Sequence, residues 1–303
     1  MKKFLVIGNP IEHSLSPKLH NYWIKENNLQ AIYAKLEVNE HDLLELCSNL
    51  KQGKLDGINV TVPFKNKIIA PLPKRFTKKL TDANKFRLLC ESKVSKPVIG
   101  YKAGGTAIPV MKKLKEKEPF YASIYKDNFL KSGKSVKISK STFGIELEVC
   151  YLIKKSFFKT KGAVSKKNIS KFISHMAPCI EVIGYRQRKK GISSFGDLSS
   201  DFGANVKFLI GQKKKYKKIN IGNLKTNIMN KKRKQNVHGN TSSVFINPLN
   251  SLKFVLNKIK KNKVNLDKDF YVFTGSTVGV VPISKGLYKG KIDKIGTVKA
   301  VIK

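Results

Sequence analysis

Apolar clusters and amphipathic stretches alternate along the first part of the chain. Short apolar clusters have the length of buried strands, and the stretches between them have the spacing of helices. Ser16-Pro17 and Asn39 are suited to begin the two helices. Strands alternating with helices predict a parallel sheet in a βαβαβ arrangement. The expected elements lie at residues 4–8, 17–27, 31–37, 40–52 and 57–63.

After about residue 69 the pattern changes to many strands and few helices. The stretch Ala70-Pro71-Leu72-Pro73 marks the junction. We expect helices at 80–93, 107–116, 166–176 and 247–261. We expect strands at 97–102, 120–125, 135–138, 144–151, 179–185, 206–211, 270–276 and 294–302. The pattern predicts an α+β chain: a βαβαβ fragment over 1–68, then a β-rich mixed domain over 69–303.

One strand, at residues 144–151, carries two carboxylates on a single face. Glu146 and Glu148 share that face with Cys150, since side chains alternate along a strand. Like charges held so close require a cation, and a third lone carboxylate, Glu181, follows in another apolar strand. Three carboxylates suit a hard divalent cation such as Mg²⁺ or Mn²⁺. Alternatively, Glu146 and Glu148 line the solvent face of an edge strand and pair with lysines.

Composition and charge narrow the class of protein. With 303 residues, 41% of them hydrophobic, the chain has material for one large or two ordinary folded domains. The net charge is +41, but only five of the 61 basic residues are Arg, the residue that nucleic-acid binders favour. Solvated surface lysines therefore explain the charge better than a polyanion-binding surface. The clusters at 213–218 and 231–234 fit surface loops or hairpin tips.

The start of the chain, its apolar runs and its cysteines indicate where the protein is located. The apolar start of the chain is too short for a signal peptide, and no apolar run is long enough to span a membrane. The four cysteines have no regular spacing, which favours a reduced, cytoplasmic location.

Two motifs in the first 68 residues resemble the N-terminal substrate domain of shikimate dehydrogenase. They are Gly8-Asn9-Pro10-Ile11-Glu12-His13-Ser14-Leu15-Ser16-Pro17 and Gly57-Ile58-Asn59-Val60-Thr61-Val62-Pro63-Phe64-Lys65. The resemblance implies that Ser14, Ser16, Thr61 and Lys65 form a shikimate-type site, with Lys65 as acid or base. It stops near Ile68, and no Gly-rich dinucleotide loop follows a strand. We therefore expect no NAD(P), no dehydrogenase activity and a vestigial site, and a truncated sheet with an edge and a face to be covered.

The remaining landmarks resemble the 2-oxopent-4-enoate hydratase and 4-oxalocrotonate decarboxylase family of the fumarylacetoacetase-like fold. They are Gly100-Tyr101-Lys102, Asp127, Glu146-x-Glu148, Ala177 to Ile183 with Arg186, Asp201, Asn247 to Asn250 and Thr274 to Gly279. The resemblance implies that Glu146, Glu148 and Glu181 bind Mg²⁺ or Mn²⁺. It implies catalytic roles for Lys102 and Asp127, and substrate contacts for Thr274 and Ser276.

Simpler interpretations of these residues remain open. Lys102 would otherwise be a surface lysine, Asp127 the first residue of an Asx turn, and Thr274 and Ser276 parts of a plain turn. The chain also departs from the family where Lys102-Ala103-Gly104-Gly105-Thr106 replaces a Lys-x-Gly-Leu-Thr motif, and where Ser200-Asp201-Phe202 replaces Ala-Asp-Asn. These loops shape the pocket in the family, so they leave the substrate's identity open.

The resemblance implies a metal-dependent hydratase that adds water to a 2-hydroxy-2,4-dienoate or unsaturated 2-oxo acid, as in the catabolism of aromatic compounds. A 4-oxalocrotonate-type decarboxylase at the same site is the first alternative. An inactive gene fusion and a polyanion-binding protein are the others, and we expect no nucleic-acid or membrane partner. The family commonly forms multimers, which implies a homo-oligomer.

Overall fold

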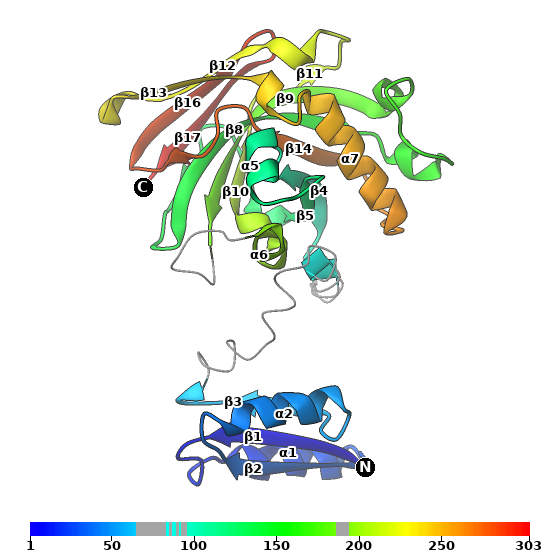
Figure 1. Cartoon of the computed structure of the whole chain (residues 1–303), viewed down its shortest axis with the longest axis vertical. Helices are drawn as coiled ribbons and strands as arrows, with labels where there is room; N and C mark the ends of the chain where they lie inside the picture. The colour runs from blue at the N-terminus through cyan, green and yellow to red at the C-terminus, as the bar shows by residue number, and fades with distance from the viewer. Residues whose placement is uncertain (65–82, 85–86, 89–90, 92–95, 186–193) are drawn as a thin grey trace. The chain divides into compact units, whose positions relative to one another are not determined.

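The structure, a computed structural model, describes residues 1–64, 83–84, 87–88, 91, 96–185 and 194–303. The chain divides into two compact units, Met1–Phe76 and Thr77–Lys303 (Figure 1). The domain boundary expected at residues 68 and 69 lies outside the described residues. Each unit is therefore considered by itself.

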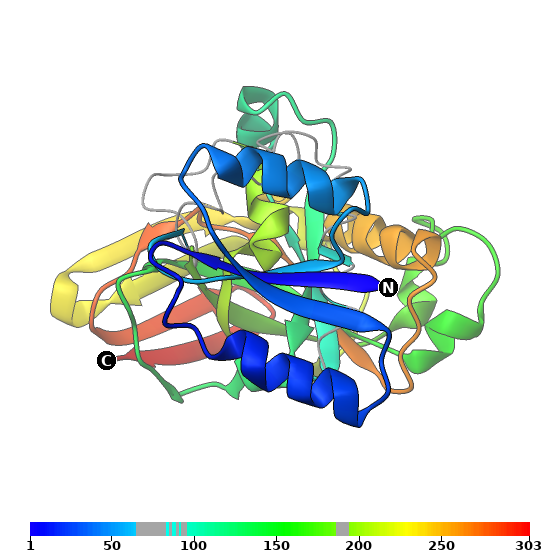
Figure 2. The same ribbon diagram turned by 90° about the horizontal axis from the view of Figure 1, so that it is seen from below.

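The first unit is a small parallel sheet with the strand order β2-β1-β3. The two helices cover opposite faces of this sheet (Figure 2). Neighbouring residues of β1 face opposite sides, so Val6 clusters with Ile24 of α1 and Ile7 with Leu43 of α2. This arrangement confirms the predicted βαβαβ fragment. The elements are β1 (Lys2–Gly8), α1 (Ser16–Glu26), β2 (Ala31–Glu37), α2 (Asp42–Lys51) and β3 (Gly57–Val60).

The second unit consists of two sheets. The larger follows the order β5-β4-β14-β8-β9-β10-β6, with β11 paired to β9 and β15 paired to β8. Its strands are β4 (Val98–Gly104), β5 (Phe120–Tyr125), β6 (Phe129–Lys131), β8 (Thr142–Ile153), β9 (Ile173–Gly184), β10 (Asn205–Ile210), β11 (Lys214–Lys215), β14 (Phe270–Ser276) and β15 (Val281–Pro282). The smaller, β13-β12-β16-β17-β7, contains β7 (Ser135–Val136), β12 (Lys225–Asn230), β13 (Gln235–Asn240), β16 (Gly286–Ile292) and β17 (Gly296–Ile302).

Few helices accompany these sheets. The helix expected at 247–261 is α7 (Pro248–Lys261), whose cap residue Asn247 accepts the Leu249 N–H at 2.8 Å. In the part of the chain that the structure describes, the other helices are α5 (Ile108–Lys113) and α6 (Phe195–Ser200), and residues 83–84, 87–88 and 91, within the helix expected at 80–93, are helical as well. Short 3₁₀ turns lie at Lys126–Asn128, Lys155–Lys159, Ile169–Phe172, Phe202–Ala204, Ile221–Asn223, Lys231–Arg233 and Thr241–Ser243. Among the described residues, no helix combines the length and apolar character needed to cross a membrane.

The main core lies on one face of β8. Leu147, Val149 and Tyr151 are buried there, in one cluster with residues of the smaller sheet and of α7. The alternation that turns these three side chains into the core turns Glu146 and Glu148 to the opposite face, as the sequence pattern predicts. The β-rich α+β character expected for this part of the chain is confirmed.

One expected helix was wrong in the sequence analysis, and the strands β12, β13 and β16 were missed. The apolar residues of 166–176 have helical spacing, but the structure has a 3₁₀ turn followed by β9, which starts at Ile173. Pairing with β8 decides the conformation there, with Ile173 opposite Ile153 and Met176 opposite Tyr151. The hairpin of β12 and β13 and the strand β16 were not expected. The basic cluster at 231–234 does lie at that hairpin's tip, as predicted.

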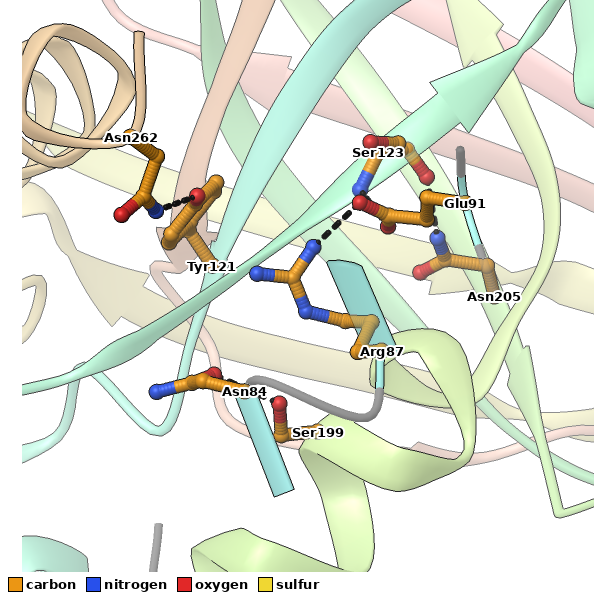
Figure 3. A network of polar contacts seen from close by, with 8 residues as sticks. All are labelled: Asn84, Arg87, Glu91, Tyr121, Ser123, Ser199, Asn205 and Asn262. Carbon is orange, nitrogen blue, oxygen red and sulfur yellow. Dashed lines mark hydrogen bonds and ion pairs between the residues drawn. The ribbon is translucent and has the colours of Figure 1, made fainter. Parts of the chain in front are cut away.

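Polar side chains form hydrogen bonds with the backbone of Ser123 at the free edge of β5, the terminal strand of the larger sheet (Figure 3). Glu91 accepts the Ser123 N–H at 3.1 Å, and Asn205 donates to the Ser123 carbonyl at 2.9 Å. Arg87, which is fully buried, donates to Glu91 at 2.6 Å and lies 4.4 Å above the Tyr121 ring. Because unpaired edge groups are costly once buried, this pair of charged residues fixes the edge.

We expect Arg87→Met to be strongly destabilising, because it leaves the Glu91 carboxylate buried without its cation. Removal of one member of a buried pair typically costs about 3–5 kcal/mol, which urea unfolding would measure. Glu118→Gln is the matched control, because it breaks an exposed pair with Lys258. Equal unfolding midpoints for the two variants would contradict the role given to Arg87.

Candidate metal centre

Strand register brings the three glutamates together. β8 and β9 are antiparallel, and Glu146 lies directly opposite Glu181. Glu148 is two residues further along β8 on the same face, opposite Cys179. One oxygen of each carboxylate lies within 4.8 Å of the others. Glu148 and Glu181 are fully buried, whereas Glu146 is partly exposed.

The surroundings disfavour three negative charges. Burial, and next the charge of Glu181, raises the pKa of Glu146 to about 7. The same two causes, with the charge of Glu146, raise the pKa of Glu148 well above its usual range. Burial also raises the pKa of Glu181, although Lys102 opposes the shift. Carboxylates arranged in this way are stabilised in their ionised form by a bound cation.

A tight glycine turn holds one oxygen of Glu148. The Gly275 N–H donates to Glu148 Oε2 at 2.9 Å. Gly275 has a φ of +107°, and a Cβ at this position would come within 2.1 Å of Thr106 Oγ1. Only glycine is compatible with both the backbone conformation and the contact, so this residue aims its N–H at the carboxylate.

Lys102 holds one oxygen of Glu181. It comes from β4, and its buried ammonium pairs with Glu181 Oε1 and donates to the Gly203 carbonyl at 3.0 Å. Burial lowers the pKa of Lys102, but the charges of Glu181, Glu146 and Glu148 together raise it above its usual value. The lysine is therefore a buried cation of the site, and the surface-lysine alternative is wrong.

Two carboxylate oxygens remain without a hydrogen-bond donor. Within the described part of the chain, no group donates to Glu148 Oε1 or to Glu181 Oε2, although both atoms are buried. An unsatisfied buried oxygen is costly. Since Gly275 and Lys102 hold the other oxygen of each group, the two free oxygens and Glu146 offer a set of hard ligands that fits a divalent cation.

The two hydroxyls of the 274–276 turn have different surroundings. Thr274 is fully buried, and its Oγ1 donates to the Val149 carbonyl at 2.8 Å, so this hydroxyl ties β14 to β8. Ser276 lies opposite Glu148 in the register and is only half-buried. Its Oγ donates to the Gly279 carbonyl at 2.6 Å. Of the two residues, Ser276 is the one within reach of a ligand.

Asp127 lies beyond the end of β5, and its catalytic role stays a prediction. Ala122 of β5 lies opposite Lys102, and β5 ends three residues later, about 10 Å further along the strand. Asp127 follows this end in an exposed 3₁₀ turn and pairs with Lys96 at 2.7 Å. Lys96 lowers the pKa of Asp127. The alternative of a turn residue therefore fits the structure.

Tyr185 is a neighbour of the site that the sequence analysis missed. Burial raises its pKa to about 12, and the charges of Asp201, Glu146 and Asp197 contribute. Its ring stacks on Phe143 with 4.4 Å between centroids. Residues 181, 183 and 185 alternate along the chain, so the strand expected at 179–185 already places Tyr185 on the same face as Glu181.

The shikimate-type residues belong to the first unit. Ser14 and Ser16 lie at the β1–α1 connection, and Thr61 directly follows β3. β1 and β3 are parallel neighbours, so both segments leave the same edge of the sheet. Gly8 at the end of β1 touches Thr61, since a Cβ there would lie 2.6 Å from Thr61 Cγ2. Lys65 and Arg186 lie outside the described residues.

Comparison with known sequences identifies the first unit. The family model of the shikimate dehydrogenase substrate binding domain matches residues 6–78. Shikimate dehydrogenase (NADP(+)) of Pelagibacter ubique is 54% identical over 68 residues, which are 22% of this chain and 26% of the relative. The Aquifex aeolicus enzyme is 47% identical over 64 residues, 21% of this chain and 24% of the relative. The chain thus spans about a quarter of the length of these curated relatives.

Comparison with solved structures identifies the fold of the remainder. The 4-oxalocrotonate decarboxylase of Pseudomonas putida G7, complexed with magnesium and adipate, has a TM-score of 0.65 at 18% identity, over 88% of this chain and 99% of that one. Fumarylpyruvate hydrolase of Pseudomonas aeruginosa, in complex with Mn²⁺ and pyruvate, has a TM-score of 0.51 at 13% identity, over 69% and 91%. The chain therefore joins a first unit that is similar to part of the shikimate dehydrogenase substrate binding domain to a second unit with the fumarylacetoacetase-like fold.

Proposed function

We propose that residues 69–303 form a divalent-metal-dependent hydratase that adds water to a 2-hydroxy-2,4-dienoate or a related unsaturated 2-oxo acid. The observation that carries this proposal is the pair of buried, donor-free oxygens on Glu148 and Glu181, next to Glu146. A Mg²⁺ or Mn²⁺ ion is the ligand that such a set of carboxylates suits.

Two further observations support a small acid as the substrate. The Pseudomonas neighbours carry magnesium with adipate and Mn²⁺ with pyruvate, both small carboxylic acids. When bound, a divalent cation would act as Lewis acid and template for the carboxylate and carbonyl oxygens of a 2-oxo acid. The partial exposure of Glu146 gives this side of the carboxylate cluster access to solvent.

Lys102 is suited to bind a substrate oxygen. Its ammonium has three N–H donors, and Glu181 and the Gly203 carbonyl accept two of them. The third can donate to a substrate oxygen, where the buried ammonium stabilises the negative charge that develops during the reaction. Tyr185 remains a neutral phenol at neutral pH, since its pKa is about 12, and can orient the added water.

A decarboxylase at the same site is the second candidate. The structural neighbour aligned over nearly its whole length is a 4-oxalocrotonate decarboxylase, which favours this reaction. Loss of CO₂ from the distal carboxylate sends the electrons of the broken C–C bond through the conjugated double bond to the 2-oxo group, which is the same electron sink that water addition needs. The residues that hold the acid would therefore serve both reactions.

Shikimate dehydrogenation is not part of this proposal. We propose that Ser14, Ser16 and Thr61, with Lys65, are a vestigial substrate site. The matched segment belongs to the substrate binding domain of enzymes named for their use of NADP(+).

We expect Glu181→Gln and Glu148→Gln to weaken Mg²⁺ or Mn²⁺ binding by more than about 100-fold, because each removes a charged ligand. Isothermal titration calorimetry on the full chain would measure this. Glu118→Gln, in an exposed pair with Lys258, should leave the affinity unchanged. Unchanged binding in both site variants would place the cation elsewhere.

Lys102→Met should abolish turnover while cation binding persists, since Lys102 contacts a ligand but is not one. The assay follows loss of dienol absorbance with 2-hydroxypenta-2,4-dienoate and CO₂ release with 4-oxalocrotonate, each with Mg²⁺ and Mn²⁺. Turnover without CO₂ identifies the hydratase, and CO₂ release the decarboxylase. Full activity of the Lys102→Met protein would contradict the role given to this lysine.

Ser276 and Thr274 can be separated by matched substitutions. Ser276→Ala should raise the KM for the acid, since Ser276 lies beside Glu148. Thr274→Val should lower stability by about 1 kcal/mol, the typical net value of one hydrogen bond, without changing the KM. A KM that rises only with Thr274→Val would reverse this assignment.

A further inference from the structure

Helix α1 of the first unit turns its apolar side outward. Leu15, just before the helix, and Leu19, Tyr22 and Trp23 within it are 76%, 49%, 58% and 48% exposed. Their spacing of four, seven and eight residues places them on one side of the helix. No residue of α1 is buried. We call these four residues the α1 stripe.

Polar contacts on the inner side fix this orientation. The Asn21 side chain donates to the Tyr33 carbonyl at 2.7 Å and accepts the Tyr33 N–H at 2.9 Å. The His20 ring stacks on the Tyr33 ring with 4.3 Å between centroids. These contacts attach α1 to β2 and occupy the outward backbone groups of Tyr33. The α1 stripe therefore cannot turn inward without breaking them, and a helix with an apolar outer face is typical of an interaction surface.

The charge around the α1 stripe favours a second copy over an acidic partner or an anionic membrane. Residues 1–64 contain seven lysines, no arginine and seven acidic residues, so the net charge of +41 arises in the rest of the chain. This segment therefore offers no net positive charge to an acidic partner and does not itself repel its own copy, whereas the charge on the rest of each chain opposes the pairing and makes it weaker at low salt. The flanks of the helix carry both signs, with Lys18 near one end and Glu26 at the other.

We propose that the α1 stripe pairs with the same stripe of a second copy of this chain. In an antiparallel pair centred on Tyr22, Lys18 of each copy faces Glu26 of the other, which is a self-complementary, two-fold arrangement. Four large side chains from each copy leave water in this pair. The interface is at the small end of the usual range, so the association is weak and depends on concentration.

The chain supplies its own probe, because Trp23 is its one tryptophan. We expect the fluorescence of the full chain to shift to the blue, and acrylamide quenching to fall, as its concentration rises to ~100 µM. Sedimentation should show the mass doubling over the same range. Leu19→Lys keeps the tryptophan and should abolish both changes. Leu44→Lys, on α2 at a side chain that is 66% exposed, is the matched control and should change neither.

Three results would overturn the proposal. A Trp23 emission maximum that stays at the long wavelength of a solvent-exposed tryptophan at every concentration would show an uncovered α1 stripe. Emission that is blue at every concentration in both the wild type and the Leu19→Lys variant would show a stripe covered within a single chain. Equal loss of association in both lysine variants would show a general effect of charge on this unit.

Discussion

Mutual repulsion between three carboxylates on adjacent strands is the constraint on which the strand-rich unit depends. Glu146 and Glu181 face each other across β8 and β9, and Glu148 lies beside them. Two of the three are fully buried, where an uncompensated charge is most costly. Lys102 compensates part of the charge, and two oxygens still have no donor within the described residues. The site is thus built around a positive charge that the side chains supply only in part.

Each group around the three glutamates has a role set by their negative charge. Gly275 brings a backbone N–H to Glu148, which only a residue without a Cβ can do in that position. Gly203, in a turn that also has positive φ, brings a carbonyl to Lys102. The ligands are therefore oriented by groups that lie on β4, β14 and the turn before β10, far apart in the sequence. Such support is what a rigid metal site requires.

Local patterns predicted much of this arrangement, and non-local pairing explains the rest. The alternation along β8 placed Glu146 and Glu148 on one face, and this is correct. Which residue of β9 lies opposite them depends on strand register, which no local pattern contains. The position of Asp127 depends in the same way on where β5 ends. The helical spacing at 166–176 was overridden by pairing with β8. Tyr185 was missed although it lies inside the expected strand at 179–185, because the side of the strand that it faces was not considered.

A cation bound by Glu146, Glu148 and Glu181 is the central claim, and anomalous X-ray scattering from crystals of the full chain grown with Mn²⁺ tests it most directly. We expect one strong peak between the three carboxylates, at about 2.0–2.6 Å from Glu148 Oε1 and Glu181 Oε2, with Lys102 still bonded to the other oxygen of Glu181. A site without a peak at saturating Mn²⁺, or a peak bound by other residues alone, would contradict the claim.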